Sequence, residues 1–85
     1  MSNVKLPPRT WVDLYAATGI TVGVQIKTIN VNPNDVRLAY TALEPVVSDD
    51  HVPLLFGRGV YQNEIGDLGA WAMCVAGGAI DVKEV

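Results

Sequence analysis

The sequence of 85 residues contains one cysteine, one histidine and only six lysine and arginine residues. A single cysteine excludes a disulfide within the chain, and a single histidine excludes zinc sites built on paired histidines. Nine acidic residues bring the net charge to −3. This balance argues against nucleic acid as a partner, because phosphate binding depends on clustered lysine and arginine. We therefore expect neither a cofactor nor a nucleic-acid partner.

Long apolar runs are also missing. No run reaches the roughly 18 to 20 apolar residues that a membrane-spanning helix needs, and the first nine residues do not have the pattern of a signal peptide. We expect no membrane contact and synthesis in a reducing cytoplasm. In that setting Cys74 is predicted to be a small buried side chain.

Apolar residues are nevertheless abundant, because 49% of the sequence is hydrophobic and only 18% is charged. A chain this short buries only about 60% of the surface that its unfolded form exposes. The composition therefore favours an oligomer or a subunit of an assembly, in which partners cover part of the apolar surface. The alternative is a monomer with exposed alanine and valine side chains.

The C-terminal stretch, residues 69–85, contains the strongest local signal. Two runs of strand length flank Gly77-Gly78, a pattern typical of a β-hairpin with a type I′ turn. The pattern predicts a pairing of Val75 with Ile80. Alternation then places the bulky side chains on one face, directed to the core. These core candidates are Trp71, Met73, Val75, Ile80 and Val82.

Residues 1–10 are predicted to form an extended arm, separate from a single β-domain of residues 11–85. Pro7-Pro8 forbids a helix there and favours an extended chain. Such an arm is either a disordered tail or a segment that lies on a neighbouring subunit. In the second case the candidates for the subunit interface are Leu6, Pro7 and Pro8.

Short alternating segments fill the rest of the chain. We expect strands over 10–15, 20–27, 36–43 and 54–56 and an irregular connection over 60–68. Residues 36–43 also suit a two-turn helix, but their β-rich neighbours favour a strand. Further core candidates are Trp11, Val22, Val24 and Ile26. The predicted fold is all-β, a small sandwich or barrel of about five to seven antiparallel strands.

Titratable groups crowd only at Asp49-Asp50-His51. Two carboxylates and an imidazole suit a divalent cation, but no third or fourth ligand is evident, and a solvated loop is the commoner use of such a cluster. Tyr61 lies in a polar segment and is the aromatic residue that we expect to be exposed. Asp49, Asp50 and Tyr61 are therefore the candidates for ligand contact. No constellation predicts catalysis.

A set of features along residues 10–85 resembles small β-rich structural proteins of tailed bacteriophages. It comprises an early Thr10-Trp11, an alternating strand, Glu44-Pro45, a turn at Gly57, Gly69-Ala70-Trp71-Ala72, Gly77-Gly78 and Ile80-Asp81-Val82. The resemblance implies a non-enzymatic virion component, made in the host cytoplasm, that coats or cements the capsid or decorates the tail. It also implies a symmetric homo-oligomer, often a trimer, with virion proteins such as the major capsid protein as further partners.

Two consequences follow from this reading. The subunit contacts are expected to include the small-residue face of the hairpin and the apolar segment Leu54, Leu55 and Phe56. The alternative function is a carbohydrate- or receptor-binding module of a phage tail, which would use Tyr61 and the acidic loop.

Overall fold

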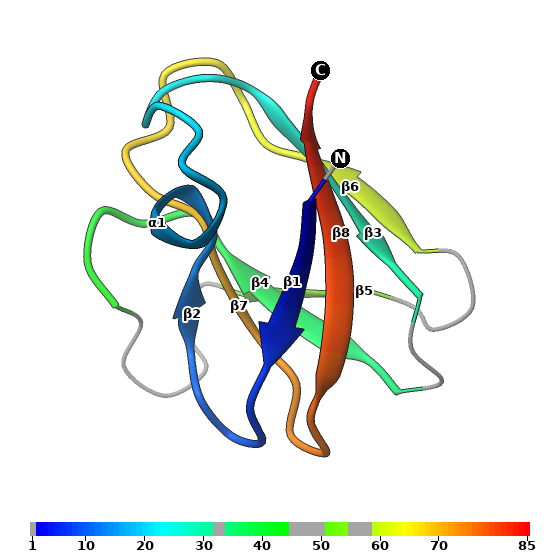
Figure 1. The fold of residues 1–85 in the computed structure, drawn as a ribbon. Helices are drawn as coiled ribbons and strands as arrows, with labels where there is room; N and C mark the ends of the chain where they lie inside the picture. The colour runs from blue at the N-terminus through cyan, green and yellow to red at the C-terminus, as the bar shows by residue number, and fades with distance from the viewer. Residues whose placement is uncertain (1, 32–33, 45–50, 55–58) are drawn as a thin grey trace.

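The computed structural model describes residues 2–31, 34–44, 51–54 and 59–85, which form two facing four-stranded antiparallel sheets (Figure 1). The strand order is β1-β8-β3-β6 in the first sheet and β2-β7-β4-β5 in the second. The prediction of a small all-β fold is therefore confirmed. The elements are β1 (Ser2–Leu6), β2 (Val12–Asp13), α1 (Leu14–Thr18), β3 (Ile26–Asn30), β4 (Val36–Ala39), β5 (His51–Leu54), β6 (Val60–Gln62), β7 (Trp71–Met73) and β8 (Gly78–Glu84).

The core lies between the sheets and receives side chains from both. Ile26, Ile80 and Val82 come from the first sheet, and Val36 and Leu38 come from the second; all five are at most 1% exposed. Alternate residues of β3 and β8 are buried, as a sheet with one face on the core requires, whereas in β4 Ala39 is buried next to Leu38. Burial of apolar area between the two layers is the main term that stabilises such a fold.

The predicted C-terminal hairpin is wrong. β7 pairs with β2 and β4, whereas β8 pairs with β1 and β3 in the other sheet. The segment between them is a turn that carries the chain from one sheet to the other, and the Gly77 amide donates to the Cys74 carbonyl at 3.1 Å. Gly77 takes a φ of +81°, which glycine adopts readily. Both strands are central, so each already has two partners and cannot also pair with the other.

The buried face of β7 is also the opposite of the predicted one. Trp71 and Met73 are half-buried and Val75 is 48% exposed, so none of the three belongs to the core as expected. Their small neighbours are fully buried instead. Small side chains here leave room between the layers for larger core residues from facing elements. The buried small residues are Ala70, Ala72 and Cys74.

Residues 2–6 do not form a separate arm. They are extended, as predicted, but they form β1 at the edge of the first sheet, where Val4 pairs with Ile80 of β8. Val4 and Leu6 are 6% and 2% exposed and belong to the core of this same chain. The domain boundary at residue 10 and the interface role of Leu6 are therefore both wrong. Alternation within residues 2–6 places these two apolar side chains on one face, which the sheet then buries.

Only residues 12–13 of the first predicted strand, 10–15, form a strand, and a helix begins at Leu14. β2 has only two residues, and the Asp13 carboxylate then accepts from the amides of Tyr15 and Ala16 as the N-cap of α1. The helix ends at Gly19 with φ +77°. An aspartate before Leu14 is a helix-start signal, and it decided the local structure here. Trp11 precedes β2 and is half-buried, outside the buried core cluster to which it was assigned.

Where a strand over 20–27 was predicted, the observed strand, β3, begins only at Ile26. Residues 21–24 form a turn instead, in which the Val24 amide donates to the Thr21 carbonyl at 3.1 Å. Val22 is 52% exposed and Val24 is half-buried, so the expectation that both are core residues is wrong. The inward positions after Ile26 are the polar residues Thr28 and Asn30, which apolar alternation could not identify.

The remaining strands follow the expected pattern in part. Residues 36–39 form β4, so the strand reading of 36–43 is correct for its first half. β5 ends at Leu54, and Leu55 and Phe56 lie outside the described residues. Residues 60–62 form β6, where an irregular connection was expected. This strand forms through pairing with β3, which is distant in sequence, and residues 60–62 have no local pattern that predicts a strand.

Gly69 allows two segments to touch. A Cβ atom at this position would lie 2.8 Å from the Thr41 carbonyl carbon and closer still to its oxygen. The backbone at Gly69 thus packs directly on Thr41, two residues beyond the end of β4, and the Trp71 indole donates to the same Thr41 carbonyl at 3.0 Å. Only glycine permits this approach.

We predict that Gly69→Ala destabilises the fold by about 3 kcal/mol, the upper end of the usual cost of overpacking. Gly66→Ala is the matched control, because a Cβ atom at Gly66 would meet no atom within 4 Å, while the backbone there has a φ of +94°. That variant should cost only about 1 kcal/mol through backbone strain. Urea denaturation of both variants measures the difference, and equal costs would contradict the close packing at Gly69.

Candidate interaction surface

Three loops meet at one end of the sandwich, beside α1 at the upper left of Figure 1. They are residues 19–25, 40–44 and 63–70. The Gly66 amide donates to the Gly23 carbonyl at 2.9 Å and joins the first loop to the third. The contact of Gly69 with Thr41 joins the third loop to the second. These links place the three loops next to one another.

Each of these loops exposes large apolar side chains. Val22 is 52% exposed, Leu43 80%, Ile65 81% and Leu68 71%. Val22 and Ile65 flank the Gly23–Gly66 hydrogen bond, and Leu68 and Leu43 flank the Gly69–Thr41 contact. We call these four residues the apolar end. Large apolar side chains exposed on adjoining loops are typical of a site where another molecule binds.

A buried hydrogen-bond network positions the loops, and Asn63 is its centre. Asn63 is 2% exposed, and its side chain accepts from the Ile26 amide at 2.8 Å and donates to the Tyr15 hydroxyl at 2.8 Å. The Asn63 carbonyl accepts from the Gln25 side chain at 2.7 Å, and the Tyr15 hydroxyl donates to the Val24 carbonyl at 2.7 Å. A satisfied buried network of this kind rigidifies the segments that it joins.

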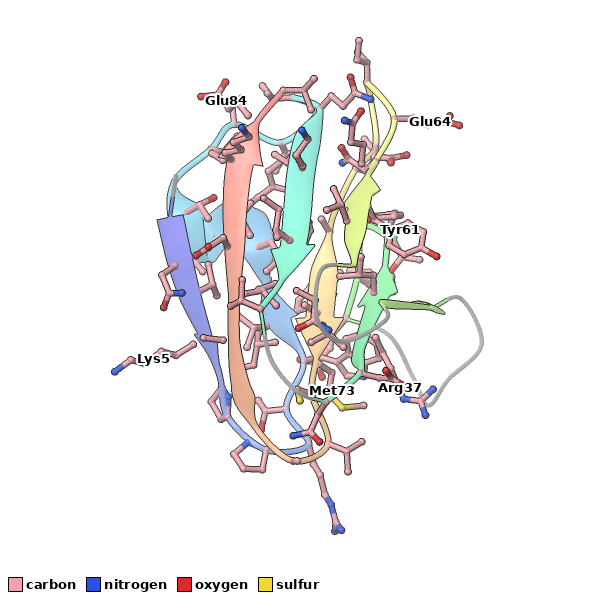
Figure 2. All side chains as sticks on the ribbon, turned by 90° about the vertical axis from the view of Figure 1, so that its right-hand side faces the viewer. Lys5, Arg37, Tyr61, Glu64, Met73 and Glu84 are labelled. Atoms are coloured by element: carbon pink, nitrogen blue, oxygen red, sulfur yellow. The ribbon has the colours of Figure 1, made fainter. Side chains whose placement is uncertain are left out.

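The charged side chains of the three loops are all acidic. The three loops contain Glu44, Glu64 and Asp67 and no lysine or arginine. The Asp67 carboxylate accepts from the Glu64 amide at 2.9 Å and closes the turn that presents Ile65. Glu44 and Glu64 are exposed (Figure 2 shows Glu64 directed to solvent). The loops of the apolar end are thus acidic, which favours a partner with basic residues, while Lys27 and Lys83 lie opposite each other on the adjoining ends of β3 and β8.

Two buried hydroxyls have no hydrogen-bond partner in the described part of the chain. They belong to Thr28 of β3 and to Tyr40, which follows β4 in the facing sheet. Burial raises the pKa of Tyr40 well above its usual value, and the negative charge of Asp67 raises it further. Tyr40 therefore stays neutral at physiological pH. Its role is to pack against the core, with its ring on the buried cluster.

The residues proposed from the sequence are dispersed. Pro7 and Pro8 are exposed at the opposite end from the apolar end, next to the turn 74–77 (Figure 1). Tyr61 is 36% exposed on β6, and Leu54 is the last residue of β5. The remaining candidates lie outside the described residues, so the acidic loop and most of the apolar segment have no structural account: Asp49, Asp50, Leu55 and Phe56.

Sequence reasoning missed Leu43, Ile65 and Leu68. Ile65 and Leu68 are large apolar residues set singly among glycine, asparagine and acidic residues in 62–69. A strand or helix pattern does not explain such a position, and this mismatch was the available signal. Their shared location with Leu43 depends on the contacts between loops, so no local pattern could reveal it.

Within residues 2–31, 34–44, 51–54 and 59–85, no group of three or more histidine, cysteine, aspartate and glutamate side chains is placed to hold a metal ion. No helix in the same part of the chain is long and apolar enough to cross a membrane. No protein-family model, curated protein or solved structure matches this chain.

Two tyrosines provide a matched test of the network. Tyr15→Phe removes the hydroxyl between Val24 and Asn63 and leaves two buried groups unpaired, so we expect a loss of about 1–3 kcal/mol in the free energy of unfolding. Tyr40→Phe removes a hydroxyl without a partner and should be neutral or slightly stabilising. Urea denaturation measures both, and an equal loss in the two variants would refute the assignment.

Proposed function

We propose that this chain is a non-enzymatic structural protein of a tailed-phage virion, which coats or cements the capsid or decorates the tail. The observation that carries the proposal is the apolar end, where four large side chains are 52–81% exposed on three linked loops. A protein that acts by assembly needs such a surface on a rigid scaffold and needs no chemistry. The resemblance of residues 10–85 to small β-rich phage structural proteins supports the same role.

The apolar end is suited to docking because it is already ordered. The Asn63 network and the Gly23–Gly66 hydrogen bond hold the loops in one arrangement before any partner arrives. A preordered surface loses little conformational entropy on binding, so more of the free energy of apolar burial is kept as affinity. This property suits a component that must attach to many identical sites.

The chemistry of this end favours another virion protein as its occupant. Two copies that met through it would bring Glu44, Glu64 and Asp67 of one chain against the same residues of the other, and like charges oppose that contact. A capsid or tail protein with an apolar site and basic residues around it has complementary chemistry. The major capsid protein is the partner that we propose, and contacts between copies of this chain, which the resemblance predicts to form trimers, lie elsewhere on its surface.

The presence of the chain in particles tests this function. Phage particles purified from cultures that produce this chain are analysed by quantitative mass spectrometry and by immunogold electron microscopy. We expect many copies per particle, located on the capsid or the tail. If the chain is absent from particles, and a glycan changes the tryptophan fluorescence of the purified protein, the carbohydrate-binding alternative is favoured instead.

The apolar end is tested by the double variant Ile65→Ser and Leu68→Ser. Each lost side chain removes about 1.5 kcal/mol of apolar burial, so binding to particles that lack the protein should weaken about a hundredfold. Val75→Ser is the control, because Val75 is 48% exposed in the turn 74–77 at the other end. Unchanged binding of the double variant, with its fold intact by circular dichroism, would remove the apolar end from the proposal.

A further inference from the structure

β6 is an edge strand, and its hydrogen bonds to β3 define which of its backbone groups are free. It pairs only with β3, with Tyr61 opposite Thr28. The Asn63 amide donates to the carbonyl of Ile26 at 3.3 Å, and the Gly59 carbonyl accepts from an amide of β3 at 2.8 Å. Positions 59 and 63 are each two residues from Tyr61. Because bonded residues alternate in an antiparallel pair, Tyr61 also bonds to β3.

The residues between these positions, Val60 and Gln62, therefore direct their N–H and C=O groups away from the sheet. No described residue hydrogen-bonds to these outward groups. Both side chains are exposed, and Val60 is 48% exposed. The strand thus presents two donors and two acceptors at the spacing that another antiparallel strand requires.

The other three edge strands are protected against such pairing. β1 carries Lys5, whose side chain extends outward from this edge strand into solvent in Figure 2, and the strand is followed by Pro7-Pro8. β2 has two residues and runs directly into α1, and β5 contains Pro53. Lysine, proline and very short strands are the usual means by which proteins block edge pairing. β6 is short, but it contains neither a charge nor a proline.

We propose that two copies of this chain pair through β6, antiparallel, about a two-fold axis at Tyr61. In this register Val60 of one copy lies opposite Gln62 of the other, and each pair exchanges two hydrogen bonds. The two outward N–H groups and two outward C=O groups of each β6 strand are then hydrogen-bonded. The first sheet of one copy and the first sheet of the other become one continuous eight-stranded sheet. The inference rests on the proposed assembly role, and it assigns a two-fold contact between copies in place of the trimer that the resemblance predicts.

A second copy fits this edge better than a foreign peptide for two reasons. The register is self-complementary, since the same two residues supply every bond on both sides of the axis. The strand is also uncharged, so pairing brings no like charges together although each chain carries a net charge of −3. The two Tyr61 rings meet at the axis, where aromatic side chains on facing positions add to the pairing.

A cysteine at the axis tests the geometry directly. In the proposed register the two Tyr61 residues face each other as a non-hydrogen-bonded pair. The Cα atoms of such a pair are about 4.5 Å apart, within the range that a disulfide spans. Tyr61→Cys should therefore form a cross-linked dimer on mild oxidation, seen on a non-reducing gel. Val75→Cys, exposed in the turn at the other end, is the control and should remain monomeric on the gel. Cys74 is fully buried and does not interfere.

A charge on the edge tests the contact without a covalent bond. Val60→Lys should weaken self-association at least about tenfold, because it places two lysines on one small interface. Val75→Lys is matched in residue type and in exposure, since both valines are 48% exposed, and should leave association unchanged. Light scattering over a range of concentrations measures the native mass, and circular dichroism verifies that each variant is folded.

The outcomes separate this inference from the proposed function. A cross-link at position 61 together with a loss of mass in Val60→Lys supports the β6 contact. Failure of Tyr61→Cys to cross-link, or a native mass that Val60→Lys does not change, overturns it. If either of these negative results is obtained and the chain is still found in phage particles, the virion role stays in place. A β6 dimer that is absent from particles refutes the virion role alone.

Discussion

The buried side chain of Asn63 is the constraint that fixes the arrangement of the end of the sandwich beside α1. Its amide group bonds to the start of β3 and to the hydroxyl of Tyr15 in α1, while its carbonyl binds Gln25. One residue thereby joins the helix, the turn before β3 and the loop after β6. Because these partners are far apart in sequence, their mutual position is set only when all of the bonds form together.

This constraint has a consequence for the two proposed contacts. Asn63 ends the ladder between β6 and β3, so it also defines which residues of β6 face outward. The loop that follows it carries Ile65 and Leu68 to the apolar end. A single network therefore orients both an uncharged strand edge, for which we propose a second copy, and exposed apolar side chains on acidic loops, for which we propose a different partner. The two proposed contacts thus differ in charge.

The sequence allowed the fold class to be predicted, but not the pairing of its strands. Alternation correctly placed Ile26, Ile80 and Val82 in positions that the core buries. It failed where polar Thr28 faces inward, and at Gly77-Gly78, where a local hairpin signal lost to pairing with strands of two different sheets. A favourable turn contributes much less free energy than the burial of an entire sheet face. Tertiary packing therefore decided which strands pair.

What the sequence by itself determined was local: an all-β composition, an extended segment that Pro7-Pro8 ends, and an acidic chain with few basic residues and an excess of apolar residues. Tertiary structure alone decided that residues 2–6 belong to the sheet, that Ala72 and not Trp71 faces the core, and that Leu43 and Leu68 share one surface. These facts depend on contacts between segments distant in the chain. A periodic pattern records which side of a strand is apolar, but not which other strand will cover it.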